Sequence, residues 1–293
     1  MDINQYPNFI EAAFELDELS LEGLFGDSTK RLVEHRNLMD QAEYFIKILD
    51  DWLLDHDQYG KPNVKALMML FIKLYLDAIQ SNPKIAVEIL AAYWRGTREN
   101  PELEGISGYT ETIRFIQEAK RKMYEIQIKS ASERKMSDLK SVMGAFITAY
   151  SKSVEYIGQI LVPCIQLVKL VNGQEIETVK VMKHTLYEKV DIFNKESNNK
   201  YRALTEVLNR DIRNADSHLS IRYIANKQII EYKKRVGAKI NTHNVTPTEW
   251  FLSIYPKVGW VIQAFIYSGV LMCIGFSDKP NFIQKYNQIF KNE

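Results

Sequence analysis

The sequence predicts a mainly α-helical protein: a helical bundle with a small β-hairpin inserted before the last long helix, plus an amino-terminal helical region. Two observations support this prediction. Apolar residues recur at three- and four-residue steps through most of the chain, as on one face of an α-helix. Near residue 221 this spacing gives way to short stretches of β-branched and aromatic residues, which are typical of strands.

The first half of the chain shows the helical spacing, interrupted by glycine and proline. Helices are expected over 32–54, 66–79 and 85–94. Pro83 precedes the third, since proline is favoured in the first turn of a helix. Residues 95–109 hold three glycines, one proline and few apolar side chains, which predicts a long connection. We therefore expect a domain boundary there, with an amino-terminal helical region at 1–109 and a second helical domain at 110–293.

The second half is expected to hold longer helices and then the hairpin. Helical patterns cover 110–140, 142–171, 176–193 and 201–212. Basic residues outnumber acidic ones along 110–140, which is typical of a solvated helix face and, alternatively, of a flank that faces phosphates. Two strand-like stretches, 221–224 and 229–232, enclose a polar turn, and 236–240 is compatible with another strand. The segment 246–249 then reads Thr-Pro-Thr-Glu, a helix-start signature that opens the last apolar helix.

Composition places the chain among globular proteins. Of its 293 residues 46% are hydrophobic and 26% are charged, which argues against disorder. Lys and Arg number 38 against 37 Asp and Glu, so any site for a polyanion must be a local patch. Cys164 and Cys273 both lie in apolar helical patterns, where free cysteine is usually a small buried side chain. This usage, and the absence of a secretory signal pattern at the first residues, favour a cytoplasmic location.

One segment has the length of a membrane-spanning helix. Residues 258–277 contain no charged side chain, and about 20 apolar residues suffice to span a bilayer. The same stretch includes Gln263, Ser268 and three glycines. We therefore expect a helix buried in the bundle and no membrane insertion.

The sequence offers little for metals or cofactors. His35, His56, His184 and His243 show no metal-ligand spacing among themselves or with the cysteines. No glycine-rich loop of the kinds that bind nucleotide phosphates is present. We accordingly expect neither a metal nor a cofactor.

The hexapeptide Arg213-Asn214-Ala215-Asp216-Ser217-His218 is the strongest candidate for chemistry. Arginine carries a fixed charge that suits phosphate, and histidine exchanges protons near neutral pH. A match to this spacing alone is close to what chance gives in a chain of this composition, so its context matters: a helical pattern precedes it, and a hairpin and a long helix follow. Alternatively, both side chains bond the last carbonyls of a helix, and Asp216 and Ser217 only cap or turn the chain.

In this context the segment 201–232, with the core Leu208–Asn209–Arg210–Asp211–Ile212 followed by the hexapeptide, resembles the HEPN superfamily of helical ribonucleases and nucleotide-binding domains. The resemblance covers about 138–277. It implies a metal-independent endoribonuclease in which two protomers bring two copies of the motif into one cleft. Arg213 would then bind the scissile phosphate, His218 would act as general acid or base, and Asn214 would orient the histidine or the phosphate. Attack by the 2′-hydroxyl would leave a 2′,3′-cyclic phosphate, and DNA would not be cut.

The resemblance also implies a biological role and partners. Such proteins are often toxins or abortive-infection effectors of antiviral defence, and we expect RNA as substrate, a homodimer, and an antitoxin or regulatory protein bound through the amino-terminal half. Basic and aromatic residues near the motif are candidate RNA contacts: Arg222, Tyr223, Lys227, Lys233, Lys234 and Arg235. Two alternatives remain open, namely a non-enzymatic helical interaction module and a domain that binds nucleotides without cleaving RNA.

Overall fold

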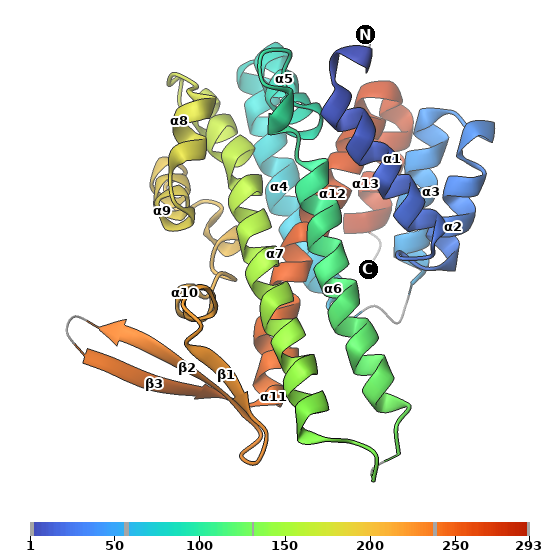
Figure 1. Ribbon diagram of the computed structural model, residues 1–293. Coiled ribbons are helices and arrows are strands. Elements are labelled where there is room, and N and C mark those ends of the chain that lie inside the picture. Colours follow the sequence, from blue (N-terminus) through green and yellow to red (C-terminus); the bar gives the residue numbers. More distant parts are fainter. Residues whose placement is uncertain (1–2, 56–58, 131, 237–238, 292–293) are drawn as a thin grey trace.

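The computed structural model describes residues 3–55, 59–130, 132–236 and 239–291, and it shows a mainly helical protein with a small antiparallel sheet (Figure 1). The expected fold class is confirmed at this level. The helices are α1 (Pro7–Leu21), α2 (Asp27–Glu34), α3 (Gln41–Leu54), α4 (Lys61–Ser81), α5 (Pro83–Arg95), α6 (Ile106–Gln127), α7 (Met136–Val171), α8 (Thr178–Lys183), α9 (Leu186–Glu196), α10 (Arg210–Ser217), α11 (Pro247–Glu249), α12 (Tyr255–Ser277) and α13 (Lys279–Phe290). The strands are β1 (Ile221–Ile224), β2 (Ile229–Val236) and β3 (Lys239–Val245).

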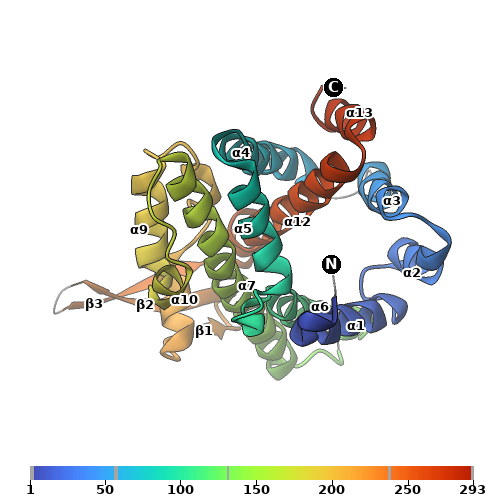
Figure 2. The same ribbon diagram turned by 90° about the horizontal axis from the view of Figure 1, so that it is seen from above.

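Helix α7 runs through the middle of the molecule. Seen from above, α9 and α10 lie on one side of it and α4, α5 and α12 on the other (Figure 2). Helix α6 packs along its length as the first arm of a helical hairpin (Figure 1). Consecutive residues Tyr156, Ile157 and Gly158 are all buried, because neighbouring helices cover most of the circumference of α7. It ends at Asn172-Gly173, where Gly173 takes the left-handed conformation with φ of 67°.

Helix α12 forms the second layer of the core. It packs against α3, α4 and α7, and the ring of Phe265 contacts Phe71, Tyr93 and Trp94. The Ser268 hydroxyl donates to the carbonyl oxygen of Met68 at 3.3 Å, which satisfies a polar group that α12 buries. The core therefore draws on helices from both sides of the expected boundary at 109/110.

Two stretches of the described residues satisfy the length and composition of membrane spans. They are Met136–Val171 and Pro247–Ser277, and 72% and 50% of their most apolar windows are buried in the protein. Core helices of soluble proteins satisfy the same criteria. The segment expected to be a buried helix, 258–277, lies within α12 and supplies core residues such as Phe265 and Leu271.

The sheet lies at one end of the bundle. Its strand order is β1-β2-β3 with antiparallel pairing, and Ile221 lies opposite Tyr232 in the first pair. Helix α10 and helix α7 both contact it. The turn after β1 falls at 225–228, as expected. The third strand, expected at 236–240, begins three residues later at Lys239 and ends five residues later at Val245. Thr246 caps α11 by accepting the Glu249 amide at 3.1 Å, which confirms the expected helix start.

Four expected helices have different bounds. The 32–54 pattern is broken after Glu34, and α3 starts beyond Asp40, whose carboxylate accepts the Glu43 amide at 2.8 Å. The 110–140 pattern is split between α6 and α7. The 176–193 pattern breaks at Thr185, which forms a capping box with Glu188. Residues 201–212 are mostly turns, and α10 begins only at Arg210. In each place, side-chain caps or turns end the helix or delay its start. The spacing of apolar residues does not show these local hydrogen bonds.

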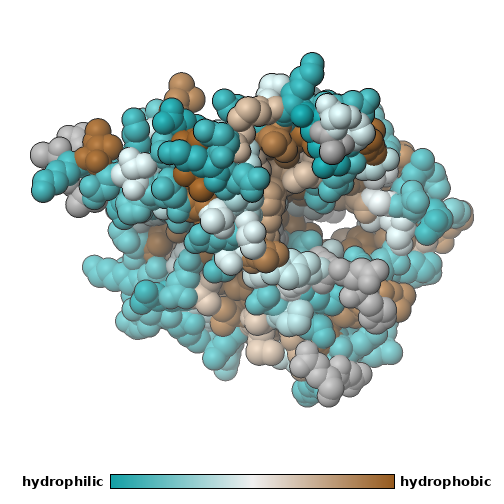
Figure 3. Space-filling view, turned by 90° about the horizontal axis from the view of Figure 1, so that it is seen from below, coloured by the Kyte–Doolittle hydropathy of each residue, from teal (hydrophilic) through white to brown (hydrophobic). Residues whose placement is uncertain are grey.

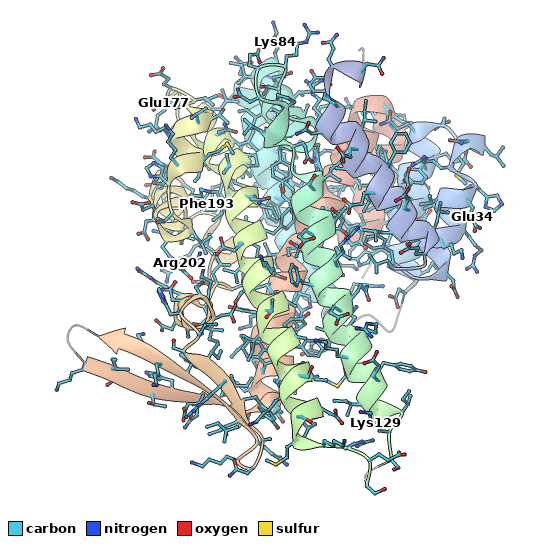
Figure 4. All side chains as sticks on the ribbon, in the orientation of Figure 1. Glu34, Lys84, Lys129, Glu177, Phe193 and Arg202 are labelled. Atoms are coloured by element: carbon cyan, nitrogen blue, oxygen red, sulfur yellow. The ribbon has the colours of Figure 1, made fainter. Side chains whose placement is uncertain are left out.

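Figure 3 shows the end of the molecule seen from below as mostly hydrophilic, with hydrophobic residues visible toward the middle and at scattered points along its edge. The two cysteines also differ from each other: Cys164 is buried as expected, but Cys273 is exposed, contrary to expectation, because it lies on the uncovered side of α12. Lys129 lies at the α6–α7 turn, far along the bundle from Lys84 (Figure 4).

Candidate functional site

Helix α10 carries most of the hexapeptide, and its start is fixed to α7. The side-chain oxygen of Asn209 accepts the amides of Asp211 and Ile212 at 3.1 and 3.2 Å, which is an N-cap. The amide of Asn209 in turn donates to the hydroxyl of Tyr150 on α7 at 3.0 Å. Ile212 and Ala215 are buried. The inner face of α10 is thereby held against α7, and its outer face carries the polar motif.

Arg213 is oriented by two neighbours. Its Nε donates to Oε1 of Glu155 on α7 at 2.5 Å, and its Nη2 contacts the same oxygen. Its Nη1 donates to Oδ1 of Asn214 at 3.2 Å. The Arg213 side chain keeps 29% of its surface exposed and Glu155 keeps 48%. Asn214 therefore contacts Arg213, whereas the resemblance implied that it would orient the histidine or the phosphate.

His218 stands at the carboxy-terminal end of α10. Its backbone amide donates to the carbonyl of Asn214 at 3.1 Å, and the side chain is exposed. Within the described residues, the imidazole has no hydrogen bond or ion pair, and it makes none with Arg213. Five positions turn about 140° around an α-helix, so the two side chains leave α10 in different directions. The Ser217 hydroxyl donates to the carbonyl of Arg213 at 3.2 Å.

The basic residues of α10 lie beside α9. The guanidinium of Arg210 lies 4.8 Å from the ring centroid of Tyr187, a cation–π contact. Burial raises the pKa of the Tyr187 hydroxyl, and the nearby charges of Arg213 and Arg210 oppose that shift. Partial burial lowers the pKa of the Lys189 ammonium, and the negative charge of Glu155 opposes it. Residues of α7, α9 and α10 therefore share one electrostatic environment.

Among the candidate RNA contacts, two basic residues form ion pairs within the described structure and two do not. Arg222 pairs with Glu231 across β1 and β2 at 2.8 Å, and Lys234 pairs with Asp211 at 2.7 Å, which raises the pKa of that lysine. Lys227 and Lys233 are exposed and form no ion pair within the described part of the chain.

The remaining two candidates are an aromatic side chain and a basic one. Tyr223 is partly buried against the core. The side chain of Arg235 lies outside the described residues. Two lysines of the set thus combine exposure with an unpaired charge in the structure.

Sequence reasoning missed Glu155 and Lys189. Their neighbourhood with Arg213 arises from the packing of α7, α9 and α10, which no sequence spacing contains. One signal was available for Glu155: it is the only charged residue between Lys152 and Lys169, within a long apolar stretch of the chain. An isolated charge in such a stretch calls for a partner.

Metal ligation and comparisons with known proteins add no further assignment. Across the residues that the structure describes, no group of three or more His, Cys, Asp or Glu side chains is placed to hold a metal ion. Comparison of the chain with protein-family models, curated proteins and solved structures finds no significant match.

The residue after His218 gives a prediction about stability. Leu219 closes α10 with a left-handed φ of 53°, and its side chain is 93% exposed. Its amide donates to Asp216 and that of Ser220 to Ala215, the hydrogen-bond pattern in which glycine is usual. Leu219→Gly should raise the free energy of unfolding by about 0.5–1 kcal/mol, because glycine adopts this conformation without steric cost. Denaturant unfolding measures the change. Leu219→Ala keeps the Cβ and is the control, and an equal gain from alanine would contradict the explanation.

Proposed function

We propose that this protein is a metal-independent endoribonuclease of the HEPN type that acts as a homodimer. The observation that supports the proposal best is the placement of His218 at the end of α10, on the helix that also presents Arg213. The His218 side chain is exposed and makes no hydrogen bond or ion pair with any residue that the structure describes. A proton-transferring imidazole must reach its substrate, and a histidine kept only for structure would be buried and bonded. The basic hairpin that follows the helix is the second support.

The proposed chemistry uses only these side chains and the RNA itself. An imidazole takes the proton of the 2′-hydroxyl, whose oxygen then attacks the adjacent phosphorus. The bond from phosphorus to the 5′-oxygen breaks, and an imidazolium donates a proton to that leaving oxygen. The guanidinium of Arg213 stabilises the added negative charge on the phosphorane. The products are a 2′,3′-cyclic phosphate and a 5′-hydroxyl.

Two copies of the motif explain the separation of its side chains. Base and acid are needed on opposite sides of the phosphorus, and one protomer supplies one histidine. Because His218 and Arg213 leave α10 in different directions, a facing protomer is a natural source of the second pair. In the same proposal Lys227 and Lys233 contact the RNA backbone, and the helices before residue 109 bind an antitoxin or regulatory protein.

One observation favours a second candidate, a non-enzymatic interaction module. Arg213 is engaged by Glu155, and this ion pair ties α10 to α7. In that case the motif is structural, and replacing Arg213 lowers stability without removing any activity.

Substitution of the two motif residues separates the candidates. Arg213→Ala and His218→Ala should each lower cleavage of total RNA by about 100-fold or more, because general acid–base and electrostatic catalysis each contribute on that order. Cleavage is followed on denaturing gels, and growth inhibition on expression should disappear in parallel. Arg202→Ala and His35→Ala replace exposed residues outside the site and should cleave normally. Undiminished toxicity in the Arg213→Ala/His218→Ala double variant would refute the ribonuclease proposal.

A site that two protomers form together predicts that inactive protein lowers the activity of wild-type protein. Excess His218→Ala protein, mixed and re-equilibrated with wild type, should reduce the activity of the wild-type protomers several-fold, because mixed dimers carry one complete pair only. The measurement is the initial rate of RNA cleavage against the mixing ratio. A rate proportional to the amount of wild-type protein alone would show that one protomer suffices.

A further inference from the structure

Glu155 occupies an unusual place beside the motif. Its Oε1 accepts a hydrogen bond from Nε of Arg213 and also contacts Nη2, so the carboxylate lies along one edge of the guanidinium. This is the edge of an arginine that a phosphate oxygen also uses, since carboxylate and phosphate present similar oxygen pairs to the guanidinium fork. The contact is open to solvent, because nearly half of the Glu155 side chain is exposed.

Lys189 brings a second cation to the same carboxylate. Leu186, three residues before it, packs against Gly158 on α7, and Gly158 lies three residues after Glu155. Helix α9 runs in the same direction as α7, because Glu196 at its end accepts a hydrogen bond from Asn172, just beyond the end of α7. Lys189 therefore lies about two turns beyond Glu155, and its long side chain leans back toward the start of α9, which is the direction of that carboxylate. The electrostatic influence of Glu155 on Lys189 agrees with this placement. Lys189 is partly exposed and has no hydrogen bond or ion pair in the described structure.

We propose that Arg213 and Lys189 form a phosphate-binding subsite for single-stranded RNA, and that the Glu155 carboxylate occupies it until a backbone phosphate displaces it. The inference rests on the proposed function and deepens it: it adds Lys189 to the substrate contacts and gives Glu155 the role of a built-in competitor. The charges fit this exchange. With Glu155 in place the two cations face one negative charge, and when it turns away they face the phosphate.

The exposure of the pair makes the exchange feasible. Partly exposed ion pairs contribute little net stability, because water and salt screen them. A clamp needed for the fold would be enclosed, as the hydrogen bond from Asn209 to Tyr150 is on the inner side of α10. Glu155 is therefore placed to hold Arg213 in position without holding it irreversibly.

Two probes test the subsite, using the full-length protein. One is inorganic phosphate, followed by the NMR signal of the Arg213 Nε–H group. The other is a 2′-O-methyl RNA oligonucleotide, which keeps its phosphates but has no hydroxyl to attack, followed by fluorescence anisotropy. Glu155→Gln should bind both probes about two- to fivefold more tightly, which is the order expected when one partner of an exposed ion pair is removed. Lys189→Gln should bind both more weakly by a similar factor.

Matched variants guard against general charge effects. Glu206→Gln removes a carboxylate that pairs with Arg202 at 2.9 Å away from the motif, and Lys195→Gln removes an exposed lysine from the same helix as Lys189. Both should bind like wild type at equal salt concentration. The gain of Glu155→Gln should vanish in the Glu155→Gln/Arg213→Ala double variant.

The outcomes separate this inference from the proposed function. If folded Glu155→Gln binds both probes no better than wild type while RNA is still cleaved, the subsite is wrong and the ribonuclease proposal stands. If Glu155→Gln gains phosphate affinity but no variant cleaves RNA, the subsite stands and the ribonuclease proposal falls. A large drop in melting temperature for Glu155→Gln without any gain in affinity would show a structural clamp and overturn the inference.

Discussion

Helix α7 is apolar around most of its circumference, so neighbouring helices must cover most of its surface. α6, α9, α10 and α12 all pack on it, and the helices before residue 109 join the same core through α4 and α5. Each buried aromatic or aliphatic side chain contributes about 1.5–3 kcal/mol when it leaves water, which makes this helix the main organiser of the fold. The sheet and the candidate site are arranged around its lower half (Figure 1).

The candidate site follows from that arrangement. α10 is short, so its position depends on contacts outside itself: the Tyr150 hydroxyl at its start, Ile212 and Ala215 on its inner face, and Glu155 on its outer side. Glu155 interrupts the apolar surface of α7 at the point where α9 and α10 meet it. A single charged residue on the central helix thus links the core of the protein to the polar motif.

Much of the fold could be predicted from sequence, because burial imposes periodicity. The helical spacing, the strand-like stretches after residue 221 and the cap at Thr246 all correspond to observed elements. Helix breaks were harder, since Asp40, Thr185 and Asn209 stop or start helices through side-chain hydrogen bonds inside otherwise regular patterns. The hexapeptide was visible as a motif, but its partners Glu155 and Lys189 come from other helices and become neighbours only when the chain folds.

We propose that RNA is cut by its own 2′-hydroxyl with the help of Arg213 and His218. The most direct measurement is mass spectrometry of the fragment ends produced when the purified protein is incubated with total RNA. We expect a 2′,3′-cyclic phosphate at one end of each cut and a 5′-hydroxyl at the other. RNA that stays intact, or fragments that carry 3′-hydroxyl and 5′-phosphate ends, would contradict the proposal.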